Sequence, residues 1–112
     1  MNDLYTQIQV KTQELNTSIK ELRNSGTNYA QAEKNYKVRL AQECLKLRDN
    51  GTPVTLIDKV CYGVPEVAEL RFKRTVAETV YRANLEAING IKLQLRLLEN
   101  QMQREYGANL SD

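Results

Sequence analysis

The chain contains no histidine and no tryptophan, and only two prolines and five glycines among its 112 residues. Without histidine it lacks the commonest general base and metal ligand. Its glycines are too scattered to form a phosphate-binding loop, and none of its serines stands beside a basic partner. Its acidic residues recur at helical spacing from Lys and Arg, which is typical of a solvated helix face. We therefore expect no enzyme activity, no cofactor and no metal site.

Long apolar runs are also missing. No segment approaches the length of a membrane span, and no signal peptide is visible at Met1. Both observations predict a soluble, intracellular protein that makes no membrane contact. The two cysteines, Cys44 and Cys61, lack metal-ligand spacing, so buried reduced thiols are the favoured interpretation. A disulfide between them is a minor alternative, because they flank the one obvious turn region.

The chain also lacks a large excess of positive or negative charge. Lys and Arg number 16, Asp and Glu number 14, and the net charge is +2 with the two signs interleaved along the chain. This balance disfavours a protein that depends on neutralising phosphates for binding. It equally disfavours an acidic mimic of DNA.

What the chain does have is a seven-residue apolar repeat in its C-terminal third. The repeat occupies two registers, Val67, Tyr81, Ile88, Leu95 and Met102 in one and Leu70, Ala77, Ile91 and Leu98 in the other. They are the a and d positions, here called the seam, of a long helix that needs a partner helix. Arg74 and Asn84 interrupt the seam. We expect Arg74 to extend out of it, whereas Asn84 either fixes the register or lies at a wet edge.

A similar repeat runs through the first half of the chain. Its main line is Ile8, Leu15, Leu22, Tyr29 and Tyr36, with Tyr5, Thr12 and Ile19 in a companion register. Because the main line keeps its phase across Gly26, we expect one continuous helix, with a kink at Gly26 allowed, rather than a break. The stripe then steps to Leu40, Cys44 and Leu47, and is widened by Val38, Ala41 and Leu45. We expect this stretch to be buried on more than one side.

Turn-forming residues mark the ends of the helices. Gly51 suits the left-handed position that ends the first helix, and Thr55 with Asp58 forms a weak capping box for a short helix. Pro65 suits the first turn of the last helix, and Gly107 is expected to end it. The expected elements are therefore a helix over about residues 3–49, a bend with a short helix over about 50–64, and a helix over about 65–106.

Helix length favours one architecture. A helix over residues 65–106 would be ~60 Å long, whereas a compact chain of this size has a radius of gyration of only ~13 Å. Only a rod of similar length can cover its seam. We expect a single all-α domain over residues 1–112, a long antiparallel, coiled-coil-like helical hairpin with a short helix at the bend. The expected helix–helix interface contains Ile8, Leu15, Leu22, Tyr36, Leu70, Tyr81, Asn84, Ile88, Ile91, Leu95, Leu98 and Met102.

A second apolar stripe lies off the seam of the last helix. It contains Val76, Val80, Ala83, Ala87, Leu93 and Leu97. Two helices alone would leave this stripe exposed, so we expect a homodimer or a larger assembly that forms a helical bundle. The alternative is a monomeric three-helix bundle whose first helix folds back at Gly26.

Residues 45–74 also show the order of elements of a helix-turn-helix. In that interpretation the helix from Pro65 would enter the major groove of DNA, and Arg71, Lys73 and Arg74 would contact it. Two glutamates in the first turn of that helix would repel phosphates, and the helix continues far beyond the length of a recognition helix. We therefore expect nucleic-acid binding to be weak.

Four stretches resemble a known group of proteins: residues 50–57, 67–78, 86–93 and 96–107. Together, over roughly residues 20–107, they resemble small helical proteins encoded by phages and prophages of Gram-positive bacteria. The genes of that group often lie near replication and recombination genes. The resemblance therefore implies an accessory factor in phage DNA metabolism, in the cytoplasm of the bacterial host, with an unknown protein partner. It carries over no functional residue, and Val64 replaces the more usual acidic residue before Pro-Glu, which implies weaker helix capping.

Overall fold

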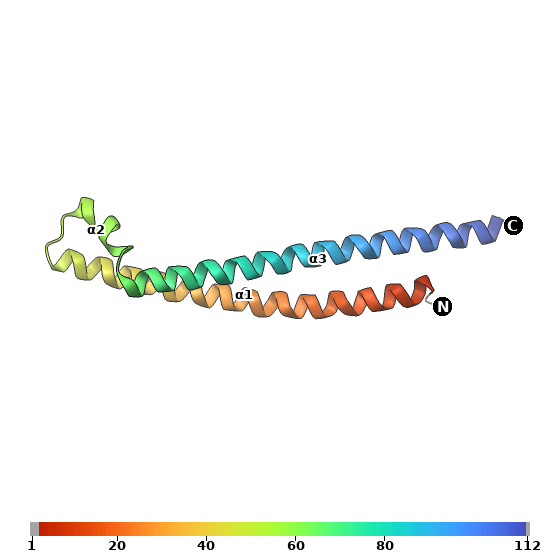
Figure 1. Ribbon diagram of the computed structural model, residues 1–112, viewed down its shortest axis with the longest axis horizontal. Helices are drawn as coiled ribbons and strands as arrows, with labels where there is room; N and C mark the ends of the chain where they lie inside the picture. Colours follow the sequence, from red (N-terminus) through yellow and green to blue (C-terminus); the bar gives the residue numbers. More distant parts are fainter. Residues whose placement is uncertain (1–2, 112) are drawn as a thin grey trace. The chain divides into compact units, whose positions relative to one another are not determined.

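The computed structural model describes residues 3–111, and the side chains of residues 3–107. Within that range it contains three α-helices and no strand (Figure 1): α1 (Leu4–Asp49), α2 (Val54–Cys61) and α3 (Pro65–Ser111). Helix α1 packs against α3 in a hairpin-like arrangement, and α2 lies at the bend. The expected all-α hairpin with a short helix at its bend is confirmed.

The contacts between the helices gather into two compact units. One unit contains Met1–Arg23 and Arg82–Asp112, and the other contains Asn24–Tyr81. Each unit pairs a part of α1 with a part of α3, and the second also contains α2. Ile88 and Ile91 are buried in the first unit, and Tyr36, Cys61 and Val67 in the second. The single domain over residues 1–112 stays a prediction.

Helix α1 is continuous through Gly26, as the unbroken seven-residue phase predicts. The three-helix bundle that folds back at Gly26 is therefore wrong. Packing explains why a glycine is tolerated here: a Cβ added to Gly26 would lie 3.3 Å from Cε1 of Tyr81. The missing side chain lets the Tyr81 ring approach the α1 backbone, beside the Tyr29 ring at a centroid distance of 5.9 Å. This contact offsets the ~1 kcal/mol that a helical glycine costs.

Gly51 ends α1 in the expected way. Its φ is +84°, the left-handed region that glycine adopts at little cost. The amide of Gly51 donates to the carbonyl of Arg48, and that of Thr52 to the carbonyl of Leu47, both at 3.0 Å. This pair of bonds is a Schellman motif, which satisfies the last carbonyls of the helix.

The capping box expected for α2 is wrong. The N-cap is Pro53, no side chain caps the helix, and the first helical residue is Val54. The Pro53 carbonyl accepts the amide of Leu56 at 2.9 Å, so the helix starts before Thr55 can act as its cap. Proline provides the extended backbone (φ −56°, ψ 137°) that the N-cap position requires.

Helix α3 begins at Pro65 as expected and continues to Ser111. Proline suits this first position because its missing N–H would have no helical partner. The end expected at Gly107 is wrong. Among the described residues only Gly51 has a positive φ, so Gly107 stays helical. A helical glycine costs only ~1 kcal/mol and does not by itself end a helix.

Candidate helix-helix interaction surfaces

The residues expected at the helix–helix interface all lie on the covered side of their helices. Tyr36, Ile88 and Ile91 are buried. The others are half-buried: Ile8, Leu15, Leu22, Leu70, Tyr81, Asn84, Leu95, Leu98 and Met102. In α3 the seven-residue repeat therefore separates the covered residues from the exposed ones along the helix.

The companion register expected in α1 is largely wrong. Tyr5 and Thr12 are exposed, although Ile19 is half-buried. The covered positions are instead Lys11, Ser18, Ser25 and Ala32, which are also seven apart. Ser25 is only 6% exposed. An apolar repeat cannot reveal these positions, and the signal that could have revealed three of them is the even spacing of the small residues Ser18, Ser25 and Ala32.

Asn84 interrupts the apolar seam of α3 with a polar contact to α1. It is half-buried, and its Nδ2 donates to the carbonyl oxygen of Glu21 at 3.4 Å. This bond is exposed and long, so it fits both the register-fixing interpretation and the wet edge.

Arg74 does not extend out of the seam as expected. Its guanidinium carbon lies 4.9 Å from the centroid of the Tyr36 ring, a cation–π distance, and Tyr36 is buried. The Nε of Arg74 is buried and has no hydrogen-bond partner among the described residues. The side chain is therefore held against an aromatic ring within the helix pair, with one polar atom unsatisfied.

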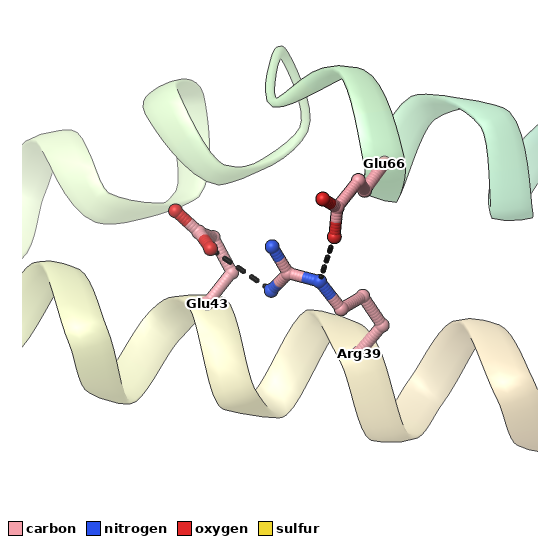
Figure 2. A network of polar contacts seen from close by, with 3 residues as sticks. All are labelled: Arg39, Glu43 and Glu66. Atoms are coloured by element: carbon pink, nitrogen blue, oxygen red, sulfur yellow. Dashed lines mark hydrogen bonds and ion pairs between the residues drawn. The ribbon is translucent and has the colours of Figure 1, made fainter.

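Two carboxylates hold Arg39 between α1 and α3 (Figure 2). Its Nε donates to Glu66 Oε2 and its Nη1 to Glu43 Oε2, both at 2.9 Å. Glu43 is buried, whereas the Glu66 side chain is 74% exposed. The bond to Glu66, followed by the bond to Glu43, raises the pKa of Arg39. This network joins the first turn of α3 to α1. Arg39 lies against the charge of Glu66, one of the two glutamates that were expected to repel phosphates.

The three residues proposed to contact DNA have different surroundings. Arg71 is exposed, with its guanidinium carbon 5.2 Å from the centroid of the Tyr62 ring. Arg74 lies against Tyr36, and Lys73 lines an apolar groove. Only Arg71 and Lys73 are exposed, so the stretch does not present the row of three basic residues that the sequence suggested.

An apolar groove, here called the α3 groove, opens beside the seam in the second unit. Its volume is about 240 Å³, and its lining is Ser25, Asn28, Phe72, Lys73, Val76, Ala77 and Val80. Phe72, Val76 and Val80 follow one another at intervals of four on α3 and are 64%, 47% and 48% exposed. The first two residues of the expected second stripe, Val76 and Val80, therefore lie off the seam.

The rest of the second stripe is exposed as well. Leu93 and Leu97 are 52% and 59% exposed, and Ala83 and Ala87 are also exposed. These four residues belong to the first unit. The separation of a covered seam from an exposed apolar stripe on α3 thus holds in both units.

The apolar face near the end of α1 is less covered than expected. Leu40, Cys44 and Leu47 are half-buried, but Val38 and Leu45 are 50% and 58% exposed. Ala41 is exposed too, so the expectation that this stretch is buried on more than one side is wrong for all three residues that widen the stripe. Helix α2 covers only part of it and exposes apolar residues of its own, namely Val54, Leu56 and Val60.

The described residues include no group of three or more Cys, Asp or Glu placed to hold a metal ion. None of the helices, as far as they are described, is both long and apolar enough to cross a membrane. Comparisons with protein-family models, with curated proteins and with solved structures find no match to this chain. The resemblance to phage-encoded proteins therefore stays a prediction.

Proposed function

We propose that this chain acts without catalysis, by packing its exposed apolar stripe against a second copy and by binding a protein partner. In this proposal it is an accessory factor of phage DNA replication or recombination, in the cytoplasm of the bacterial host. The setting rests on the sequence resemblance alone. The mode of action rests on one observation, the row of exposed apolar side chains on α3.

Magnitudes show how much apolar surface association requires. Covering a fully exposed Val, Leu or Phe side chain contributes roughly 1.5–3 kcal/mol, so a side chain already half covered contributes about half as much. Phe72, Val76 and Val80 from two copies then supply about 5–9 kcal/mol. Lost freedom on association costs about 4–15 kcal/mol. The groove alone approaches the balance point, and stable dimerisation needs further apolar residues such as Leu93 and Leu97.

Sedimentation equilibrium tests the self-association. We expect a dimer or a larger species at tens of micromolar protein, with the mass falling on dilution. Val76→Asp is expected to shift the protein towards the monomer, because a charge in a covered apolar contact has no partner. Asn89→Asp, the same change in charge at an exposed position of α3 outside the stripe, should leave the mass unchanged. A wild-type monomer under these conditions would refute the proposal.

A second experiment addresses the partner. Affinity capture from infected cells, with and without nuclease, should recover the same proteins in both cases if the chain binds protein directly. Partners lost on nuclease treatment would favour the alternative, DNA binding through residues 45–74. That alternative has less support, because Arg74, one of its three basic residues, lies against Tyr36, and only Arg71 and Lys73 are exposed.

A further inference from the structure

The two cysteines lie on different helices and have different exposure. Cys44 is half-buried on α1, and Cys61, the last residue of α2, is 1% exposed. Both are free thiols. Neither belongs to the seam of α3 or to the exposed stripe, so the proposed self-association does not use them.

The packing of α2 on α1 brings the two thiols together. A groove of about 390 Å³ is lined by Cys44, Leu45 and Arg48 from α1 and by Val54 and Ile57 from α2. Cys61 follows Ile57 by four residues, which places it one turn further along the same face of α2. Cys44 is a close enough neighbour of Cys61 to raise the pKa of the Cys61 thiol.

The two thiols differ in reactivity for a physical reason. Burial raises the pKa of Cys61, and the neighbouring Cys44 and Asp58 raise it further. The Cys61 Sγ also donates to the carbonyl oxygen of Asp58 at 3.4 Å. Because the thiolate is the nucleophile, Cys61 reacts slowly with reagents in solution. Cys44 is only half-buried and borders the groove, so its thiol is the more accessible of the two.

We propose that Cys44 and Cys61 form a reversible disulfide that fastens α2 to α1, in which Cys44 reacts first with a low-molecular-weight disulfide and Cys61 completes the bond. The Cys44 thiolate attacks one sulfur of oxidised glutathione, forms a mixed disulfide and releases one glutathione thiolate. The Cys61 thiolate then attacks Cys44 Sγ and releases the second glutathione. The two cysteines lose two electrons and two protons, which the two glutathione molecules gain.

The test uses the full chain incubated with oxidised glutathione without oxygen, followed by alkylation of remaining thiols and mass spectrometry. We expect an unalkylated chain that has lost two hydrogens and gives a Cys44–Cys61 linked peptide, and dithiothreitol should restore both thiols. The oxidised chain should also melt several degrees higher than the reduced chain, because the bond closes a loop across the bend.

Two single variants separate the roles of the thiols. Cys61→Ser should stop at a stable glutathione adduct on Cys44, whereas Cys44→Ser should form an adduct at least about ten times more slowly. Helical circular dichroism checks that both variants fold. A wild-type chain that keeps a single adduct, adduct formation at equal rates in both variants, or a disulfide between two chains as the main product would each overturn the proposal. None of these results depends on whether the chain dimerises without oxidant.

Discussion

At Gly26, a single missing side chain lets the Tyr81 ring of α3 approach α1. A Cβ added there would lie 3.3 Å from the ring, whereas one added at Gly90 meets nothing within 4 Å. We expect Gly90→Ala to raise the free energy of unfolding by about 0.5–1 kcal/mol through helix propensity. Gly26→Ala should gain clearly less, because Tyr81 must move away. Urea denaturation of both variants checks this, and an equal gain at the two positions would contradict the packing role of Gly26.

Arg74 combines a favourable and an unfavourable contact. Its guanidinium faces the Tyr36 ring, which contributes about 0.5–2 kcal/mol, but its buried Nε is unsatisfied, which costs about 1–3 kcal/mol. Arg74→Met keeps a long, flexible side chain and removes the polar atom. We therefore expect it to unfold at the same or a slightly higher urea concentration than the wild type. A loss above ~2 kcal/mol would show that the cation–π contact dominates.

The surroundings of two residues, Ser25 and Arg74, could not be predicted from the sequence. An apolar repeat identifies covered leucines and isoleucines, but Ser25 is equally well buried and is polar. It lies beside residues of α3 at the α3 groove, a tertiary neighbourhood that no local pattern shows. The position of Arg74 depends on Tyr36, a contact between residues 38 positions apart that no local pattern shows.

Among the elements, the first turn of α3 is joined to α1 by the Arg39 network. Removing Arg39 leaves the buried Glu43 without the partner shown, whereas removing the charge of exposed Glu66 leaves Arg39 its bond to Glu43. We therefore expect Arg39→Met to lower the urea midpoint more than Glu66→Gln does, since an unpaired buried charge is the costlier defect. The order should persist at high salt, because salt screens exposed pairs more than buried ones. An equal loss in the two variants would contradict it.

The seam of α3 can be tested by placing a charge inside it and another outside it. Ile88 is 5% exposed, whereas Lys92, four residues later, is exposed. Ile88→Asp buries a charge without a partner and should cost several kcal/mol, enough to abolish folding or assembly. Lys92→Asp should change stability by no more than about 0.5 kcal/mol. Thermal melts followed by circular dichroism compare them, and similar curves would show that the assigned register does not describe the packing.

The ends of the helices show where local chemistry suffices. Gly51 ends α1 because the chain turns there, and the left-handed conformation satisfies the last carbonyls. Gly107 carries the same residue type but stays within α3. Glycine permits an end without requiring one, so the sequence predicts the first end correctly and the second incorrectly. The start of α2 depended on Pro53 rather than on the polar pattern that follows it.

For the whole molecule, the arrangement of apolar residues matters more than their number. Seven-residue spacing separated the covered seam of α3 from its exposed stripe, because a helix that packs against one partner covers one face. The sequence did not show that Val38 and Leu45 stay exposed. Their exposure depends on how much of α1 the short helix α2 covers, which is a property of tertiary packing.

The charge of the whole molecule governs how it meets nucleic acid. With a net charge of only +2, and with 14 acidic residues interleaved among the 16 basic ones, the chain attracts phosphates weakly. At ~150 mM salt, near physiological ionic strength, we expect at most weak, sequence-independent binding to duplex or single-stranded DNA, with a shallow dependence on salt. Replacing exposed Arg71 and Lys73 together with Ala should weaken any such binding equally for all sequences, because phosphate contacts carry no sequence information. Titrations monitored by fluorescence anisotropy measure the affinity, its salt dependence and the effect of the double variant. Tight binding to one sequence that this double variant abolishes would instead establish residues 45–74 as a DNA-reading element and overturn the proposal that the chain acts through protein contacts.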